Sequence, residues 1–185
     1  TLTRALMGLL TADGEILIDG TPLTDRLQIA ARLAYVPQIA PLMAATVDEI
    51  SGGRFVLGLG AGRNRTEFDA FGIPFDHRVA RFEESWTIIR ELVGGGRSTF
   101  AGTYWRSDDA VLLPERVGGG AIPLMVGSNG ERVLEITLRH AHSWNTWFTE
   151  FGNTPEGFAE RSARVSSIAT RVGRDPSTLD RSACV

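Results

Sequence analysis

The sequence contains no lysine, and all 19 of its basic residues are arginine. This absence excludes a Schiff-base lysine and the lysine of a phosphate-binding P-loop within these residues. Cysteine is nearly absent as well, because Cys184 stands alone. A single cysteine excludes an internal disulfide and a multi-cysteine metal site, so we expect a reducing, cytoplasmic compartment.

Long apolar runs are also missing, and none approaches the roughly 20 residues that a membrane-spanning helix needs. The net charge of −3 gives no reason to expect nucleic acid or an anionic membrane as a partner. The 185 residues, 43% of them apolar, suffice for one globular domain with a sizeable core. Because the sequence begins without methionine and ends on the apparent opening of a strand, we expect both ends to be cuts.

A short apolar run that ends in three alternating glycines is the most informative feature of the chain. Residues 54–64 read Arg-Phe-Val-Leu-Gly-Leu-Gly-Ala-Gly-Arg-Asn, with glycines at 58, 60 and 62. A strand that runs into such a turn lets backbone N–H groups approach a phosphate or a flat ring. The spacing is not the dinucleotide fingerprint Gly-x-Gly-x-x-Gly, because Arg63 stands where that motif requires its third glycine. A tight strand-to-helix connection without a ligand stays open as the alternative.

A second candidate cradle is Gly127-Ser128-Asn129-Gly130, which lies between an apolar strand and a helix. Its N–H groups would point at an anion bound at the start of that helix, and the Ser128 and Asn129 side chains could add hydrogen bonds. An ordinary helix cap is the alternative. Two such turns at two strand ends favour ligand binding.

Periodicity predicts alternating strands and helices from residue 54 onward. We expect strands over 55–59, 123–126 and 141–145 and a final strand after the turn at 173–177, a hairpin over 99–105, a loop over 106–121, and helices over 41–50, 65–71, 79–93, 131–139 and 155–172. Short apolar strands with intervening helices predict an α/β fold with a parallel sheet or barrel, and a ligand at the carboxyl ends of its strands.

Few residues suggest catalysis by side chains. His140 and His142 lie two residues apart, but no carboxylate stands in register with them, so we predict no metal site. No Gly-x-Ser-x-Gly elbow is present to support a serine nucleophile, and we assign no catalytic residue. Trp144 and Trp147 are expected in the core, with Trp144 as a candidate pocket wall.

Several segments, in order, resemble the luciferase-like monooxygenases, a family that includes reductases using the deazaflavin coenzyme F420. They lie within about residues 42–185 and are Met43–Gly62, Glu67 with Phe71-Gly72, Arg78 with Arg81–Glu84, Phe100-x-Gly102-x-Tyr104, Pro123–Gly130 and Ala141–Asn145. The resemblance implies that residues 41–185 form a partial (β/α)₈ barrel of the TIM type, incomplete at both ends. It also implies an oxidoreductase or monooxygenase that acts on a small organic substrate, and it leaves a homo-oligomer open.

The same resemblance implies FMN or F420 as the cofactor, bound across the carboxyl ends of the strands. The residues that match the family's cofactor-binding positions are Gly60, Ala61, Gly62 and Asn64 beside the rings, Gly127, Ser128, Asn129 and Gly130 at the phosphate, and Trp144 as a wall. The sequence departs from the family's pattern at Arg63, where tryptophan is frequent, and at His142-Ser143, where Asp-Gly is frequent. These departures would change the shape of the pocket.

The first 38 residues resemble a different family, the ATP-binding cassettes of ABC transporters. Residues 1–10 are similar to the helix after the P-loop, 14–20 to the next hairpin, and 34–38 to the Q-loop. The sequence therefore predicts an ABC-like fragment over residues 1–40, fused ahead of the partial barrel at about residues 38–42. An ATP-binding transporter subunit and an inactive chimeric fragment are the alternative functions, and the first of them lacks a P-loop lysine and a Walker B acid.

Overall fold

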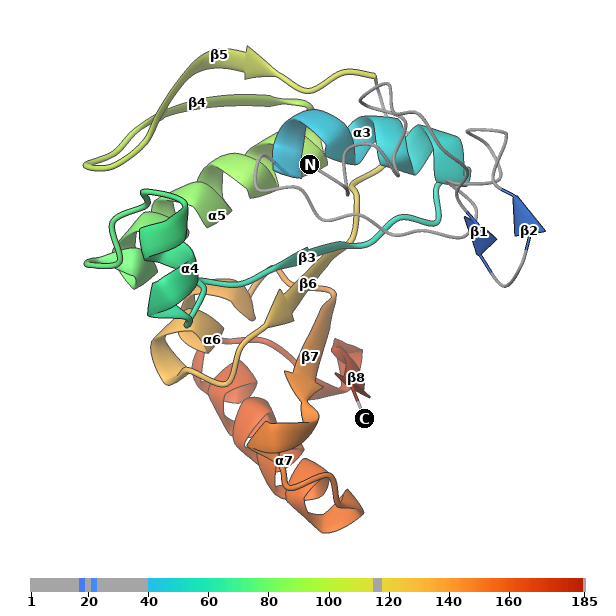
Figure 1. The fold of residues 1–185 in the computed structure, drawn as a ribbon, viewed down its shortest axis with the longest axis vertical. Coiled ribbons are helices and arrows are strands. Elements are labelled where there is room, and N and C mark those ends of the chain that lie inside the picture. The colour runs from blue at the N-terminus through green and yellow to red at the C-terminus, as the bar shows by residue number, and fades with distance from the viewer. Residues whose placement is uncertain (1–16, 19–20, 23–39, 115–117, 185) are drawn as a thin grey trace.

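A four-stranded parallel sheet forms the centre of the protein in a computed structural model, which describes residues 17–18, 21–22, 40–114 and 118–184 (Figure 1). Its strands, neighbours in chain order, are β3 (Leu57–Leu59), β6 (Leu124–Gly127), β7 (Ser143–Trp147) and β8 (Asp180–Cys184). All carboxyl ends therefore lie at one edge of the sheet, where parallel α/β folds place their ligands.

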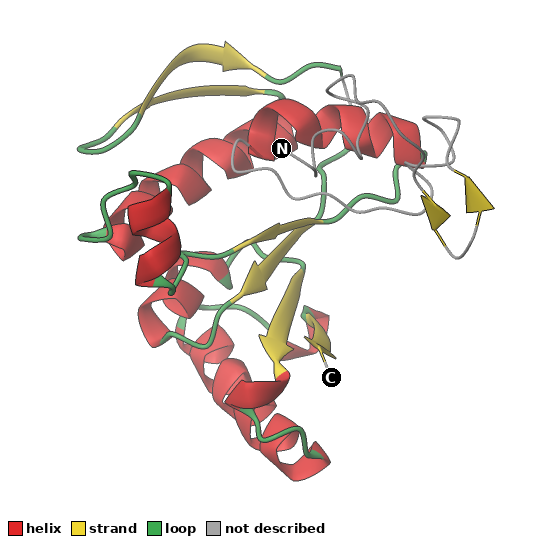
Figure 2. Ribbon diagram, viewed as in Figure 1, coloured by secondary structure: helices red, strands yellow, loops and turns green. Residues whose placement is uncertain are grey.

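Helices alternate with these strands along the chain (Figure 2). They are α3 (Ala40–Ser51), α4 (Arg65–Ala70), α5 (Arg78–Gly95), α6 (Glu131–Thr137) and α7 (Pro155–Arg171), with short 3₁₀ turns η1 (Phe148–Glu150) and η2 (Pro176–Thr178). This order confirms the α/β class and the strand–helix alternation predicted from the sequence. Within the described residues, no helix is both long and apolar enough to cross a bilayer.

The core lies between the sheet and the helices that follow its strands. Inward side chains of the strands, such as Leu57, Val126 and Trp144, are at most 2% exposed. They pack with buried residues of α5 and α7, among them Trp86 and Ile168. Burial of this apolar surface fixes which face of each helix meets the sheet, and so it fixes where the loops at the carboxyl ends emerge.

The hairpin between α5 and β6 is longer than the sequence predicted. It joins β4 (Arg97–Ala101) to β5 (Arg106–Val111) in antiparallel register, so the loop expected over 106–121 is wrong for residues 106–111. Half of β5 is polar and exposed, and it therefore lacks the apolar alternation by which strands are recognised. Pairing with β4 stabilises it instead, as in the contact of 2.9 Å between the Ser98 and Ser107 hydroxyls.

A single carboxylate of α5 holds the tip of this hairpin. Glu84 accepts hydrogen bonds from the backbone N–H groups of Thr103, Tyr104 and Trp105 at 2.8, 2.8 and 2.9 Å. Desolvation acts to raise the pKa of Glu84, but these three N–H donors and the charge of Arg81 outweigh it and hold the pKa below its ordinary value of 4.5. The carboxylate form is therefore the one that the folded hairpin favours.

Glu84→Gln is expected to loosen the hairpin tip without unfolding the core. The amide keeps one acceptor oxygen and loses the charge, so exchange of the 103–105 amide protons should accelerate by about tenfold. Because the folded pKa lies below the unfolded one, the stabilisation exists above pH 4.5 and is lost as the pH falls through the folded pKa. Hydrogen exchange followed by mass spectrometry or NMR measures the effect.

The matched control is Glu83→Gln, which removes the same charge from the neighbouring position. Glu83 is exposed and contacts Arg132 at 3.4 Å, away from the hairpin. Equal acceleration in both variants would contradict the role given to Glu84.

Little of the stretch that resembles an ABC cassette falls among the described residues. Two-residue strands β1 (Leu17–Ile18) and β2 (Thr21–Pro22) pair antiparallel there. The other segments of that resemblance, over 1–10 and 34–38, lie outside the described residues.

Candidate functional site

The two glycine turns meet at the carboxyl ends of neighbouring strands. Gly60 follows β3 directly, Gly127 ends β6, and Leu59 pairs with Val126 in the parallel register. A Cβ atom on Gly60 would lie only 3.1 Å from the carbonyl oxygen of Gly127. Glycine at position 60 therefore lets the two backbones approach closely where a ligand would bind.

Gly62 is restricted both by its backbone and by its surroundings. Its φ of 73° lies in the left-handed region, and a Cβ atom there would meet the Phe68 ring at 2.6 Å. The turn ends at Asn64, whose side chain caps α4: it accepts from the Thr66 N–H at 3.1 Å and donates to Glu67 at 2.8 Å. The Asn64 side chain is thus engaged in capping rather than facing a ligand.

A cavity of about 610 Å³ opens between the two turns and the end of β7. Six of the residues predicted from the sequence line it: Ala61, Gly62, Gly127, Ser128, Asn129 and Gly130. The structure therefore brings together the two segments that the sequence analysis paired. Gly60, Asn64 and Trp144 lie outside its lining.

Trp144 supports the cavity from beneath instead of forming its wall, which corrects the wall position expected from the sequence. It is 0% exposed, stacks on Phe158 with ring centroids 5.9 Å apart, and donates its indole N–H to the Ser128 carbonyl at 2.8 Å. The exposed ring at the cavity belongs to Trp147, which is 49% exposed, so the expectation that Trp147 lies in the core is wrong. Inward and outward positions alternate along a strand, so residues 144 and 147 face opposite sides of β7.

The side chains of the Gly127–Gly130 loop bond within the protein. The Asn129 amide donates to the Thr146 hydroxyl at 2.9 Å, and the Ser128 hydroxyl accepts from the Gly130 N–H at 3.2 Å. The bond from Asn129 to Thr146 ties the loop to β7. The Ser128 hydroxyl keeps its own proton, and the Asn129 amide keeps a second N–H, so both side chains retain a donor.

Three arginines line the same cavity. The sequence placed Arg63 at the pocket, but none of the three was predicted to bind the ligand. Arg63 pairs with the Glu150 carboxylate at 2.6 Å, Arg161 donates to the Glu150 carbonyl at 2.8 Å, and Arg78 donates to the Gly62 carbonyl at 3.2 Å. Glu150 is the one carboxylate among the described lining residues, so positive charge is in excess. The cavity therefore suits an anionic group.

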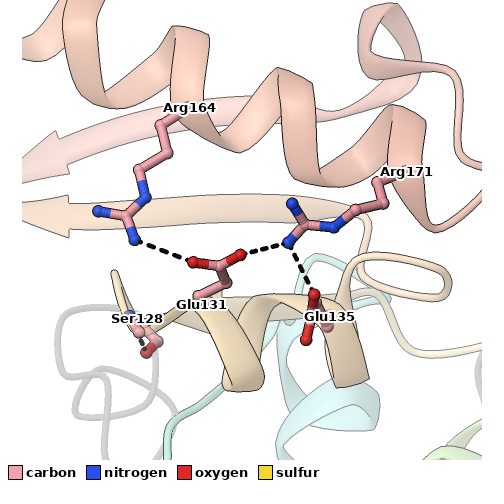
Figure 3. Close-up of polar contacts among 6 residues, drawn as sticks. Ser128, Glu131, Glu135, Arg164 and Arg171 are labelled. Carbon is pink, nitrogen blue, oxygen red and sulfur yellow. Dashed lines mark hydrogen bonds and ion pairs between the residues drawn. The ribbon is translucent and has the colours of Figure 1, made fainter.

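Ion pairs between α6 and α7 hold the start of α6, next to the second glycine turn (Figure 3). Glu131 lies between Arg171 at 2.5 Å and Arg164 at 3.4 Å, and Arg171 also contacts Glu135 at 2.7 Å. The hydrogen bond and charge of Arg171 hold the pKa of Glu131 below its ordinary value of 4.5 against the effect of desolvation, and Arg164 lowers it further. These half-exposed ion pairs join the first turn of α6, which follows residues 127–130 directly, to α7.

The described residues contain no group of three or more His, Cys, Asp or Glu side chains that could hold a metal ion. The His142 side chain binds the backbone of β6, because its Nδ1 accepts a hydrogen bond from the Leu124 N–H at 3.1 Å. His142 does not line the cavity, where arginines and glycine-rich backbone are the groups that could bind and orient an anion.

A model of the luciferase-like monooxygenase family matches residues 24–185. The chain belongs to this family. The match begins within the stretch that resembles an ABC cassette and includes both glycine turns and every residue that lines the cavity.

Relatives of known function are similar over most of this chain. A pyrimidine monooxygenase, RutA of Escherichia coli, is 34% identical over an alignment of 162 residues that covers 82% of this chain and 43% of that protein. The chain thus spans less than half the length of this curated relative.

Solved structures share the fold at lower identity. The coenzyme F420-dependent tetrahydromethanopterin reductase of Methanopyrus kandleri superposes with a TM-score of 0.63 and 21% identity, covering 85% of this chain and 52% of that one. A type II Baeyer–Villiger monooxygenase of Pseudomonas putida, in complex with FMN, gives a TM-score of 0.57 and 20% identity over 76% of this chain and 42% of that one. The fold is therefore a partial barrel of the TIM type, as the sequence resemblance implied.

Proposed function

We propose that the cavity between the two glycine turns binds reduced FMN or F420, in an oxidoreductase or monooxygenase that acts on a small organic substrate. The observation that carries the proposal is the meeting of Ala61–Gly62, Gly127–Gly130 and three arginines around one cavity at the carboxyl ends of parallel strands. Family membership supports it, as do the E. coli relative described as a monooxygenase and the solved structures described as F420-dependent and FMN-bound.

The residues present fit a cofactor that is flat at one end and anionic at the other. Side chains at positions 60 and 62 would meet the Gly127 carbonyl or the Phe68 ring, so the backbone itself is available to face a ring. Arg63, Arg78 and Arg161 supply guanidinium donors, which match the geometry of a phosphate group.

In this proposal, the backbone of Gly60, Ala61 and Gly62 lies beside the rings, and the loop Gly127–Gly130 with the arginines holds the phosphate. Asn64 positions the first turn by capping α4, and Trp144 positions the second from below. The bound cofactor supplies hydride transfer or, with O₂, oxygen transfer, while the protein orients it and limits access of water. No residue of the described chain is assigned as acid or base.

Titration of the purified chain with FMN, F420, riboflavin and Mg-ATP tests the proposal. FMN or F420 should raise the melting temperature, and riboflavin should do so less because it lacks the phosphate. A shift with Mg-ATP alone would support the transporter alternative and overturn the proposal. No shift with any ligand, together with a broad unfolding transition, would favour the inactive chimeric fragment.

Substitution of a cavity arginine sharpens this test. Arg161→Gln should weaken FMN or F420 binding by about tenfold, since a charge-assisted hydrogen bond is lost. The control, Arg106→Gln, removes the same charge from the exposed hairpin and should leave affinity unchanged. Equal weakening in both would show that the arginine of the cavity does not contact the ligand.

Other features of the protein stay predictions from the sequence. We infer a division into an ABC-like fragment over 1–40 and a barrel fragment over 41–185, joined at about 38–42. A cytoplasmic location and a homo-oligomeric state also stay predictions from the sequence. The family match begins at residue 24, inside the first of these two parts.

A further inference from the structure

The central parallel sheet has two unpaired edges. Its strand order is β3-β6-β7-β8, and among the described residues no further strand pairs with the outer edge of β3 or of β8 (Figure 1). An edge strand presents a row of backbone N–H and C=O groups that can bond to another strand. Both edges of the sheet are therefore available for pairing.

One face of the same sheet is also uncovered. Side chains that point toward the helices, such as Leu124 and Trp144, are buried. Successive residues of a strand point to opposite faces, and no strand residue of the other face is buried. Parallel sheets are normally covered on both faces, and the inner face of a barrel is covered by the strands opposite. The uncovered face therefore has the exposure expected for the inside of an open barrel.

The missing cover corresponds to a second set of parallel strands. The sheet contains four strands, which is half the number in a closed (β/α)₈ barrel. The chain likewise covers 52% and 42% of the two solved structures described above. A second copy, related by a two-fold axis along the barrel, would supply as many strands again, all running in the same direction.

The register of the sheet indicates which residues such a copy would bring together. One row of paired residues crosses the uncovered face from Gly58 through Met125 and Ser143 to Asp180. Strands of a barrel tilt and follow one another in a right-handed sense, so a row followed once around returns about eight residues nearer the amino end. Half a circuit shifts the row by about four residues. The residue that follows Asp180 in the row is therefore Arg54 of the second copy.

Asp180 and Arg54 carry opposite charges, and both side chains are exposed. Neither makes an ion pair or a side-chain hydrogen bond within the described part of the chain. A two-fold arrangement forms the pair twice, because Arg54 of the first copy then faces Asp180 of the second. This charge complementarity favours a second copy over an unrelated partner as the occupant of the two edges.

We propose that two copies of this chain associate edge to edge and close into one parallel barrel. In this dimer, β8 of each copy lies beside β3 of the other, and we call these two contacts the seams. All carboxyl ends, and with them both glycine-turn cavities, lie at the same rim. The association does not depend on the cofactor proposed for those cavities, because Asp180 and Arg54 lie at the amino ends of β8 and β3.

Sedimentation velocity over a range of protein concentrations tests the proposal, and the unaltered chain should form a dimer. Asp180→Arg and Arg54→Asp each place like charges at both seams, so each should raise the dimer dissociation constant by about tenfold or more. The double variant Asp180→Arg/Arg54→Asp restores opposite charges at both seams. So does an equimolar mixture of the two single variants, and both samples should recover the dimer.

The controls are Arg106→Asp and Asp108→Arg, which make the same charge reversals on the exposed hairpin. They should leave the dimer dissociation constant unchanged, and far-UV circular dichroism verifies that every variant is folded. A monomer at high micromolar concentration would overturn the proposal, as would an assembly larger than a dimer. Equal weakening by the control variants, or failure of the double variant and the mixture to recover, would overturn it as well.

Discussion

Trp144→Ala should lower the free energy of unfolding by about 3–5 kcal/mol, the range for loss of a fully buried tryptophan. The side chain is 0% exposed and packs on Phe158, and its removal leaves a large hole beneath β7. It also leaves the Ser128 carbonyl without its indole donor. Urea denaturation measures this loss, which should appear as a lower midpoint concentration of urea with an unchanged slope.

Trp147→Ala is the matched control for this prediction. The same residue type three positions along is 49% exposed, and its removal should cost less than about 1 kcal/mol. Similar losses in the two variants would contradict the burial described for Trp144. Trp144→Phe separates the two contributions, because it retains most of the stacking and loses the hydrogen bond, with an expected cost of about 1–2 kcal/mol.

Gly62→Ala should destabilise the protein by about 2–4 kcal/mol and weaken FMN or F420 binding by at least about tenfold. The alanine would have to adopt a left-handed backbone conformation, and its Cβ atom would press against the Phe68 ring. Relief of either strain moves the turn that faces the cavity, so stability and affinity should fall together. Thermal unfolding and cofactor titration measure the two effects.

Gly72→Ala isolates the backbone contribution. Gly72 has a φ of 66°, close to that of Gly62, but nothing lies within 4 Å of a Cβ atom there. Gly72→Ala should lower the free energy of unfolding by about 1–2 kcal/mol, the cost of a left-handed backbone conformation for a residue with a Cβ atom, and it should leave cofactor affinity unchanged. Equal losses in the two variants would show that the Phe68 contact has no role.

The sequence could predict those elements whose signals are local. Thr154 followed by Pro155 predicts the start of α7, and the Thr154 hydroxyl does accept from the Gly157 N–H at 3.1 Å. The glycines that end β3 and β6 mark both turns of the cavity. Strand β5 was missed because its stability comes from β4 and Glu84, partners that no local pattern reveals.

The residues of the candidate site likewise fall into those that the sequence could predict and those that it could not. Backbone positions such as Gly62 and Gly127 could be found, since glycine itself signals close approach. Arg78 and Arg161 could not, because they reach the cavity only through the packing of α5 and α7. Trp144 shows a further limit: an aromatic side chain within a strand faces either the ligand or the core, and only the register of β7 decides.

The absence of lysine has a consequence for the cavity at the strand ends. Every cation that lines it is an arginine, and no histidine is among its described lining residues. A guanidinium keeps its proton throughout the range in which proteins are stable. An anion bound in this cavity would be held by guanidinium groups, each of which can donate two parallel hydrogen bonds to it, and it would meet a single carboxylate, Glu150, among the described lining residues.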